Sequence, residues 1–353
     1  MSDRQRQNAG TAPVRPGHQF DTRRLDAWLK IHVVNYCGPL EVEQFQGGQS
    51  NPTFKLTTPG QSYVMRRKPT GTLLPGAHAI EREFRVLNAL FQTGYPVPQP
   101  YALCSQEDVV GSCFYVMDMV KGRSIWDTSF PDVPRDERPR YFDAMNQAIA
   151  QLHSLDYHAL GLGTYGVRGG YVARQIKRWS AQYRSDSIAG SDVNLDKLLD
   201  WLPAQIPADD ETTLIHGDFR CDNLIFHASE PRVIAVLDWE LSTLGHPVAD
   251  FAFHAMMYRL PPFLITGVMG LDFEAVNIPT EEAYVQAYCR RTGRSSIPNY
   301  DFYIIFNMFR LAAILHGIRA RVARSTAASA HAKQMAAFVG PLARLAWQRV
   351  REI

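Results

Sequence analysis

The stretch HGDFRCDNLIF occupies residues 216–226, and VIAVLDWE follows it at residues 233–240. Together they place Asp218, then Asn223 five residues later, then Asp238 at the end of the second apolar run. This spacing predicts a loop that presents a carboxylate and an amide oxygen, beside a strand that delivers a second carboxylate. Such oxygens are hard ligands suited to Mg²⁺, so Asn223 and Asp238 are candidate metal ligands and Asp218 is left to orient or deprotonate an attacking hydroxyl. The alternative is a polar β-hairpin whose carboxylates only cap turns.

The composition is that of a folded protein whose charge recognition must be local. The length of 353 residues predicts about two domains or lobes. A content of 46% hydrophobic and 20% charged residues excludes a wholly disordered chain. The formal net charge of +2 supplies no general attraction to nucleic acid or to an anionic membrane. We therefore expect no nucleic-acid partner.

The N-terminus and the cysteines indicate in which cellular compartment the protein is expected. Residues 1–17 contain no apolar run of a secretory signal, and we expect them to form a flexible tail. The five scattered cysteines show neither a C-x-x-C pair nor zinc-ligand spacing, which indicates a reducing, cytoplasmic compartment. Residues 260–271, an uncharged stretch near the C-terminus, are too few to span a bilayer, so no membrane association is expected.

The first third of the chain reads as a small sheet with helices. Residues 21–33 have apolar side chains at helical spacing behind a capping aspartate, and residues 78–92 repeat apolar positions as an amphipathic helix does. Apolar alternation between turn residues predicts five strands, at residues 41–46, 52–58, 61–68, 101–106 and 111–120.

The rest of the chain reads as mostly helical. Long helical patterns occur at residues 138–155, 172–183, 195–202, 281–291 and 302–324, interrupted by β-like runs at 223–227 and 232–237. A β-rich first part joined to a helical remainder predicts an α+β protein with two lobes and a cleft. We place the lobes at residues 18–118 and 119–353.

The motif H-G-D-x-x-x-x-N, followed by L-D-W, resembles the aminoglycoside phosphotransferase and choline kinase-like superfamily, which is related to the protein kinases. Within it the chain is most similar to the kinase domain associated with acyl-CoA dehydrogenases. The stretches that carry this similarity are GGQSNPTF (47–54), YVMRRKP (63–69), EREFRVL (81–87), FYVMDMVKGR (114–123) and LDWELSTLGHPVADFA (237–252). The resemblance implies a protein kinase-like fold, with a small β-rich N-lobe for the nucleotide and a larger helical C-lobe. It also implies phosphoryl transfer from ATP, with Mg²⁺, to a hydroxyl group of a small molecule.

The resemblance assigns roles to the loop residues. Asp218 is expected to be the catalytic base, with Asn223 and Asp238 as the metal ligands. The loop over the nucleotide phosphates is expected at Gly47, Gly48, Gln49, Ser50 and Asn51, where small residues let backbone N–H groups approach an anion. An ordinary Gly-Gly hairpin turn is the alternative for this loop.

Further residues are expected to hold the nucleotide. Arg66 stands where protein kinases place a lysine against the phosphates, and Lys68 lies on the same strand face as the alternative. Glu83 is expected to pair with this cation, although Glu81 is nearby.

The same resemblance extends to the lobe connection and the catalytic loop. Asp118 and Met119 are expected to bind adenine through their backbone. Asp250 and His216 are expected to brace the catalytic loop.

The acceptor is the least determined element. Residues 251–353 contain 12 Arg and Lys but 6 Asp and Glu, which favours an anionic acceptor such as a hydroxyacyl-CoA or a hydroxy acid. His316 and Arg319 share a face of the helix at 302–324 and are expected either to line the acceptor site or to form a buried pair. An aminoglycoside or amino-alcohol kinase and a nucleotide-binding pseudokinase are the alternatives. The sequence predicts neither an oligomeric state nor a preference for ATP over GTP.

Overall fold

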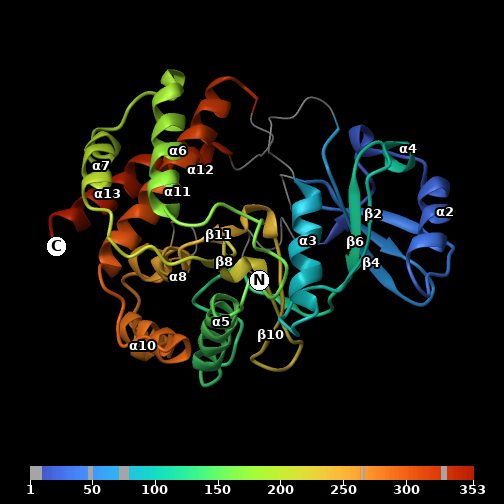
Figure 1. Cartoon of the computed structure of the whole chain (residues 1–353), viewed down its shortest axis with the longest axis horizontal. Coiled ribbons are helices and arrows are strands. Elements are labelled where there is room, and N and C mark those ends of the chain that lie inside the picture. The colour runs from blue at the N-terminus through green and yellow to red at the C-terminus, as the bar shows by residue number, and fades with distance from the viewer. Residues whose placement is uncertain (1–9, 47–50, 71–78, 263, 265–266, 327–331) are drawn as a thin grey trace. The chain divides into compact units, whose positions relative to one another are not determined.

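The computed structural model describes residues 10–46, 51–70, 79–262, 264, 267–326 and 332–353. The chain divides into two compact units, whose helices and strands are labelled in Figure 1. Unit 1 consists of Met1–Ala144, His158–Leu162 and Arg220–Ser242. Unit 2 consists of Met145–Tyr157, Gly163–Phe219 and Thr243–Ile353.

Unit 1 is built on a six-stranded antiparallel sheet in the order β1-β2-β3-β4-β6-β5. The strands are β1 (Thr11–Ala12), β2 (Glu41–Phe45), β3 (Thr53–Thr57), β4 (Ser62–Arg67), β5 (Pro100–Cys104) and β6 (Phe114–Asp118). The five longer strands confirm the predicted alternation. A turn at residues 58–61 joins β3 to β4, and its Thr58 N–H donates to the Gln61 carbonyl at 2.9 Å.

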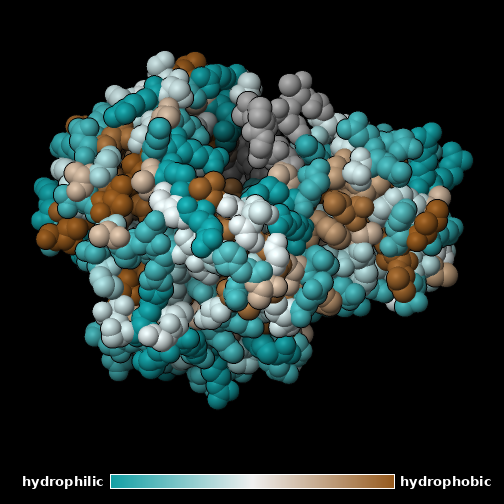
Figure 2. All heavy atoms as spheres, viewed as in Figure 1, coloured by the Kyte–Doolittle hydropathy of each residue, from teal (hydrophilic) through white to brown (hydrophobic). Residues whose placement is uncertain are grey.

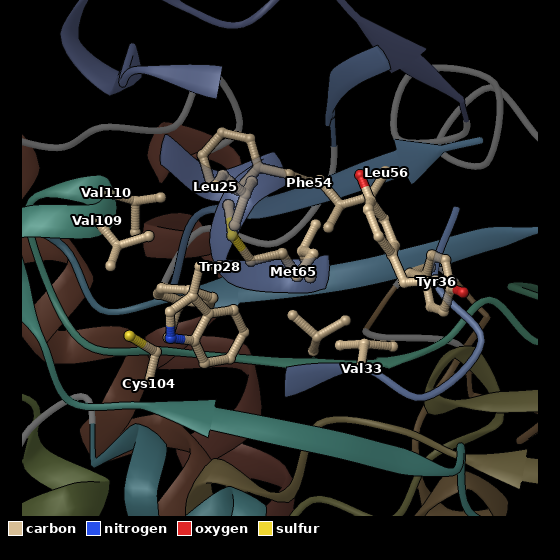
Figure 3. Close-up of a cluster of buried hydrophobic side chains, with 14 residues drawn as sticks. Leu25, Trp28, Val33, Tyr36, Phe54, Leu56, Met65, Cys104, Val109 and Val110 are labelled. Atoms are coloured by element: carbon tan, nitrogen blue, oxygen red, sulfur yellow. The ribbon is translucent and has the colours of Figure 1, made fainter. Parts of the chain in front are cut away.

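One face of the sheet packs against α2 (Thr22–His32) and α4 (Glu107–Val110). The α2 helix begins where predicted, because the Asp21 carboxylate accepts a hydrogen bond from the Arg23 N–H at 2.9 Å. Figure 3 shows side chains of α2, α4 and the strands pointing toward one another in this core. Its fully buried members include Leu25, Leu29, Phe54, Leu56, Met65, Phe114 and Val116.

The other face of the sheet carries α3 (Ile80–Phe91). Successive side chains of a strand point to opposite faces, so neighbouring arginines of β4 separate. Arg67 lies in the α2 core, where its guanidinium stacks over Phe20 and Phe54. Arg66 points the other way and meets α3 at Glu83. This alternation delivers one charged side chain to the nucleotide face predicted from the sequence.

The LDW stretch of unit 1 follows a small antiparallel sheet of β10 (Val233–Val236), β9 (Leu224–Phe226) and β7 (Arg123–Ser124). Val236 pairs with Leu224, and the Leu237 N–H donates to the Asn223 carbonyl at 2.8 Å. Because the strands are antiparallel, the residue before β9 and the residues after β10 lie at the same end of the ladder. Asn223 and Asp238 therefore emerge together.

Unit 2 is mostly helical (Figure 1). Its helices of at least six residues are α6 (Tyr171–Ser185), α7 (Val193–Ala204), α8 (Pro247–Ala255), α10 (Glu281–Thr292), α11 (Tyr300–Ala323), α12 (Ala332–Ala337) and α13 (Val339–Val350). A further helix, α5 (Arg138–His153), belongs partly to each unit. The strands β8 (Thr213–Ile215) and β11 (Thr243–Gly245) pair antiparallel. The turn that carries Asp218 comes directly after β8.

The central helix of unit 2 is α11. By length and composition it is the one helix of the described residues that could cross a membrane, unlike residues 260–271, which are too few. Of its most apolar 18-residue window, 83% is buried inside the fold, as in the core helix of a globular domain. Asn307, midway along α11, donates to the carbonyl of Ala249 on α8 at 2.8 Å. The α11 helix therefore packs in the core of unit 2.

The surface is largely hydrophilic in the view of Figure 2, with hydrophobic residues scattered over it. The most exposed large hydrophobic side chains of the described chain include Ile31 and Val34, close together near the end of α2. Single exposed hydrophobic residues are normal on folded proteins.

The fold is α+β as predicted, an N-terminal antiparallel sheet followed by a mostly helical part. The expected tail differs in part: residues 1–9 lie outside the described residues, but Thr11 and Ala12 pair with β2. The Arg15 N–H also donates to Gln44 at 3.1 Å, so local pairing fixes the chain earlier than residue 18. The lobe boundary at residue 118 stays a prediction, because the compact units are grouped differently and unit 1 includes residues 220–242.

Candidate functional site

Arg66 and Glu83 form a buried ion pair in unit 1. Arg66 Nε lies 2.9 Å from Glu83 Oε2, and the Glu83 side chain is only 1% exposed. The Tyr115 hydroxyl on β6 donates to the same carboxylate at 3.1 Å. Glu81, the alternative partner, is exposed. None of the described carboxylates lies within ion-pair distance of Lys68, so the structure brings Arg66 to the acidic cluster.

The ion pair sets the charge of its members. Burial raises the pKa of Glu83 to about 7, while the Arg66 charge works in the opposite direction. Burial alone would lower the pKa of Arg66, but the Asp238 and Glu83 carboxylates raise it above its ordinary value. Arg66 is therefore a permanent cation in a setting of little solvent.

Arg66 also contacts the residues of the LDWE stretch. Its Nη2 lies 2.6 Å from Asp238 Oδ1 and 3.2 Å from Glu240 Oε2. Asp238 has φ +65°, a left-handed conformation that residues other than glycine adopt rarely and that carries backbone strain. The strained turn aims its carboxylate at Arg66, while η4 (Trp239–Leu241) follows at once. Strained residues of this kind cluster at functional sites.

The expected phosphate loop is described only at its last residue. Gly47, Gly48, Gln49 and Ser50 lie outside the described residues. Asn51 is 1% exposed, and its Nδ2 donates to Glu83 Oε1 at 3.1 Å and to Glu240 Oε2 at 3.4 Å. The residue at the end of this loop is thus tied to two of the three carboxylates that hold Arg66.

The expected adenine-binding residues lie at the end of β6. The Asp118 N–H donates to the Gln99 carbonyl at 2.8 Å, so this donor already has a partner within the protein. Met119 follows the strand and is half-buried. A role for either backbone in binding adenine stays a prediction.

Asp218 belongs to unit 2, in a turn held by its neighbours. The Asp250 carboxylate accepts hydrogen bonds from the His216 N–H at 2.9 Å and the Gly217 N–H at 2.8 Å. The Asp218 N–H donates to His216 Nδ1 at 3.1 Å. Gly217 has φ +83°, which favours glycine at this position. The turn is therefore fixed immediately before the predicted base.

The brace of this turn is itself charged. Burial alone would raise the pKa of Asp250, but His153, whose Nε2 lies 3.2 Å away, and the His216 N–H hold it below its ordinary value. Asp250 is thus ionised and accepts three hydrogen bonds without contact with solvent.

Three residues that contribute to the site were not predicted from the sequence. Glu240 and Tyr115 hold Arg66 and Glu83, and Arg310 donates to the Gly217 carbonyl at 2.6 Å. The second acid of LDWE was a signal for Glu240. The other two depend on contacts distant in sequence, for which a single sequence holds no signal.

A sequence profile described as the phosphotransferase enzyme family matches residues 41–303. This chain belongs to the phosphotransferase enzyme family. Acyl-CoA dehydrogenase family member 10 of Mus musculus is 42% identical over 340 residues, which cover 96% of this chain and 32% of that protein. The chain thus spans less than half the length of this relative.

Solved structures agree with the family assignment. A Ralstonia eutropha JMP134 protein, provisionally classed as an aminoglycoside phosphotransferase, superposes with a TM-score of 0.87 at 49% identity. The match covers 95% of this chain and 99% of that one. An aminoglycoside phosphotransferase solved with ADP and hygromycin B has a TM-score of 0.60 at 13% identity, covering 92% and 97% of the two chains. The latter similarity shows the shared fold.

The two residues proposed for the acceptor do not form one wall. His316 is 1% exposed, its ring lies tilted against that of Tyr183, and its Nε2 lies 2.8 Å from the Gly190 carbonyl. Arg319 donates to the Ala336 carbonyl on α12 at 3.2 Å. Helical spacing does place them on neighbouring positions, but His316 is in the packed interior, where an acceptor has no access to it. A role for Arg319 stays a prediction.

The expected metal ligands of this phosphotransferase suit a metal shared with a nucleotide. Among the described residues, no group of three or more His, Cys, Asp or Glu side chains is arranged to hold a metal. Mg²⁺ in such enzymes is typically held by one or two protein groups, with phosphate oxygens and water completing the shell. Asp238 is 34% exposed at the ladder end that also carries Asn223, which fits such a partial ligand set.

Proposed function

We propose that this phosphotransferase moves the γ-phosphoryl group of ATP, with Mg²⁺, to a hydroxyl group of a small molecule. The observation that carries the proposal is the position of Arg66, a permanent cation held by Glu83, Asp238 and Glu240. A guanidinium binds phosphate oxygens through two parallel hydrogen bonds. Glu83, which accepts a hydrogen bond from Tyr115, holds the guanidinium at the sheet face, so it need not be ordered when the nucleotide arrives.

The proposed reaction uses Asp218 as the base. The acceptor oxygen attacks the γ-phosphorus and forms a P–O bond, the bond from the γ-phosphorus to the bridging oxygen breaks, and ADP leaves. The hydroxyl proton passes to Asp218. Mg²⁺, when bound, would neutralise charge on the phosphate oxygens. Asn223 and Asp238 would hold it, while residues 47–51 and the backbone of Asp118 and Met119 would contact the nucleotide.

The acceptor we propose is anionic, a hydroxyacyl-CoA or a hydroxy acid. Support comes from α6, which has no acidic residue and exposes cations on one face, namely Arg174, Lys177, Arg178 and Arg184. Within the described chain, no carboxylate lies at ion-pair distance from any of the four. Neighbouring like charges on a helix destabilise it, and an anionic ligand would offset that cost.

Tyr171, the first residue of α6, is within electrostatic reach of Arg310 and Asp250, the residues that hold the Asp218 turn. Burial raises the pKa of Tyr171, and these two charges also act on it. By contrast, several arginines among residues 251–353 are already neutralised: Arg259 by Glu281, Arg294 by Glu211 and Arg349 by Asp301. The excess of positive charge in residues 251–353 is therefore weaker support for an anionic acceptor than the exposed cations of α6.

The test is a screen for release of ADP from ATP, or of GDP from GTP, over hydroxyacyl-CoAs, free hydroxy acids, amino alcohols and aminoglycosides. We expect turnover with an anionic acceptor, and Asp218→Asn should lower kcat by about 10²–10⁴ with ATP binding retained. Turnover with aminoglycosides alone would overturn the acceptor class. ATP binding without any turnover would favour a pseudokinase.

The double substitution Lys177→Glu with Arg178→Glu tests the acceptor surface. We expect a KM for the anionic acceptor raised about tenfold, with the KM for ATP unchanged. Arg23→Glu with Arg24→Glu, which reverses two exposed charges on α2, is the matched control. Equal effects of the two changes on the KM for the acceptor would reject α6 as the acceptor-binding surface.

A further inference from the structure

Arg310 is a buried cation in the middle of α11, and the proposed chemistry has no use for it as a contact. It is 4% exposed, and its guanidinium stacks over the Phe253 ring at 5.1 Å. Among the described residues, no carboxylate lies at ion-pair distance from it. Burying a charge without an ionic partner is costly unless its hydrogen bonds serve a purpose.

The bond that Arg310 makes is to the peptide of Asp218. Its Nη2 donates at 2.6 Å to the carbonyl of Gly217, which shares one planar peptide unit with the N–H of Asp218. That N–H donates to His216 Nδ1, and the N–H of Gly217 donates to Asp250. The peptide unit before Asp218 is therefore held at its N–H by His216 of the same turn and at its carbonyl by Arg310 of α11, while Asp250 of α8 holds the N–H of the preceding peptide unit.

The flexibility of Gly217 makes these restraining hydrogen bonds necessary. Gly217, at φ +83°, has no side chain to restrict its backbone, and a rotation there would swing the carboxylate of Asp218. The bonds from Asp250 fix the N–H side of Gly217 alone. A misplacement of about 1 Å in a catalytic group can cost about 10²-fold in rate.

We propose that Arg310 is a positioning residue that fixes the Gly217–Asp218 peptide and so aims the base. The proposal rests on the function proposed above for Asp218. It predicts that loss of the guanidinium frees the turn and lowers kcat, while residues that meet ATP in unit 1 keep their affinity. A purely structural role would instead lower stability without a selective effect on kcat.

The experiment compares Arg310→Met and Arg310→Lys with Arg349→Met. Arg349 also anchors α11, through Asp301 at 2.7 Å, but it does not touch the turn. Amide hydrogen exchange of residues 214–220, read by mass spectrometry, needs no turnover. We expect faster exchange there in Arg310→Met and no change in Arg349→Met.

Kinetics with the acceptor found in the screen form the second readout. Arg310→Met should lower kcat by about 10–100-fold with the KM for ATP within about twofold, and Arg310→Lys should recover part of the loss. If Arg310→Met does not fold, Arg310→Lys is compared with Arg349→Lys by the same two measurements.

The outcomes separate the two proposals. Unchanged exchange, or a kcat no lower than in the Arg349 variant, overturns the role of Arg310. If exchange is faster in Arg310→Met but the wild type transfers no phosphoryl group, Arg310 still fixes the Gly217–Asp218 peptide. The function proposed for Asp218 is then rejected.

Discussion

Arg66 Nη2 lies 2.6 Å from Asp238 Oδ1, so the cation expected to bind phosphates and the carboxylate expected to bind the metal are each other's partners. A metal-nucleotide that binds at Asp238 must compete with this ion pair. Glu240, 3.2 Å from the same Nη2, and Glu83 would remain to hold Arg66 if Asp238 bound a metal. The second carboxylate of LDWE would thus let Asp238 change partner without leaving Arg66 unpaired.

Asp238→Asn should separate the charge of this residue from its backbone. Asparagine tolerates the left-handed conformation of φ +65°, so the fold should persist, but the neutral amide is a poorer metal ligand. We expect the Mg²⁺ concentration for half-maximal ADP release to rise at least about tenfold, and kcat to fall. A magnesium titration checks this. An unchanged magnesium requirement with the fold intact would remove Asp238 from the metal site.

Arg66→Met should raise the KM for ATP by about tenfold or more, because it removes a cation from buried carboxylates and from the phosphates. Arg66→Lys should restore part of the loss, since a point charge replaces a planar fork. Isothermal titration with ATP provides the affinity. Lys68→Met is the matched control. Our strand assignment is wrong if that control is the damaging variant.

Glu83 should make stability fall as pH rises. Burial raises its folded pKa to about 7, above the ordinary value of 4.5 near which it titrates when unfolded. Between these values the folded state binds more protons than the unfolded state, so its relative stability declines up to about pH 7 and is flat beyond. Urea unfolding at pH 5, 6, 7 and 8 should show wild type losing stability relative to Glu83→Gln across this window. The exposed Glu81→Gln should show no such trend, and a trend of the opposite sign would contradict the assignment.

The sheet and its first helices were predictable because their patterns are local. The alternation of apolar residues in β3 and β4 and the helix cap at Asp21 each depend only on adjacent residues. Successive side chains of a strand point to opposite faces, which places Arg66 and Arg67 on opposite faces of the sheet. The helix α8 was missed because each of its nine residues is buried, which erases the contrast between polar and apolar faces. The strands β8 and β11, with three residues each, are too short to show a period.

The same limit kept both alternatives open for His316 and Arg319 on α11. His316 and Arg319 were rightly expected near one another on the helix, but α11 is buried on most of its circumference, so spacing could not tell which face meets a ligand. Glu240 is visible in the sequence as the second acid of LDWE, but its contact with Arg66 was not predictable, for a different reason. The turn at Asp238 redirects the chain, and the direction of a side chain after such a turn follows from the three-dimensional backbone.

Asp250→Asn tests whether the turn needs a charged brace. Asparagine offers one acceptor oxygen where the carboxylate accepts from the His216 and Gly217 N–H groups and from His153, so at least one buried donor loses its partner. Such a loss costs about 1–3 kcal/mol of stability, which urea unfolding would show. The freed turn should also lower kcat about tenfold or more with the KM for ATP unchanged. Asp272→Asn, at the exposed cap of α9 (Phe273–Val276), is the control, because asparagine caps a helix about as well as aspartate. If Asp250→Asn matches this control in both stability and kcat, the carboxylate does not hold the turn and Asp218 is positioned by other contacts.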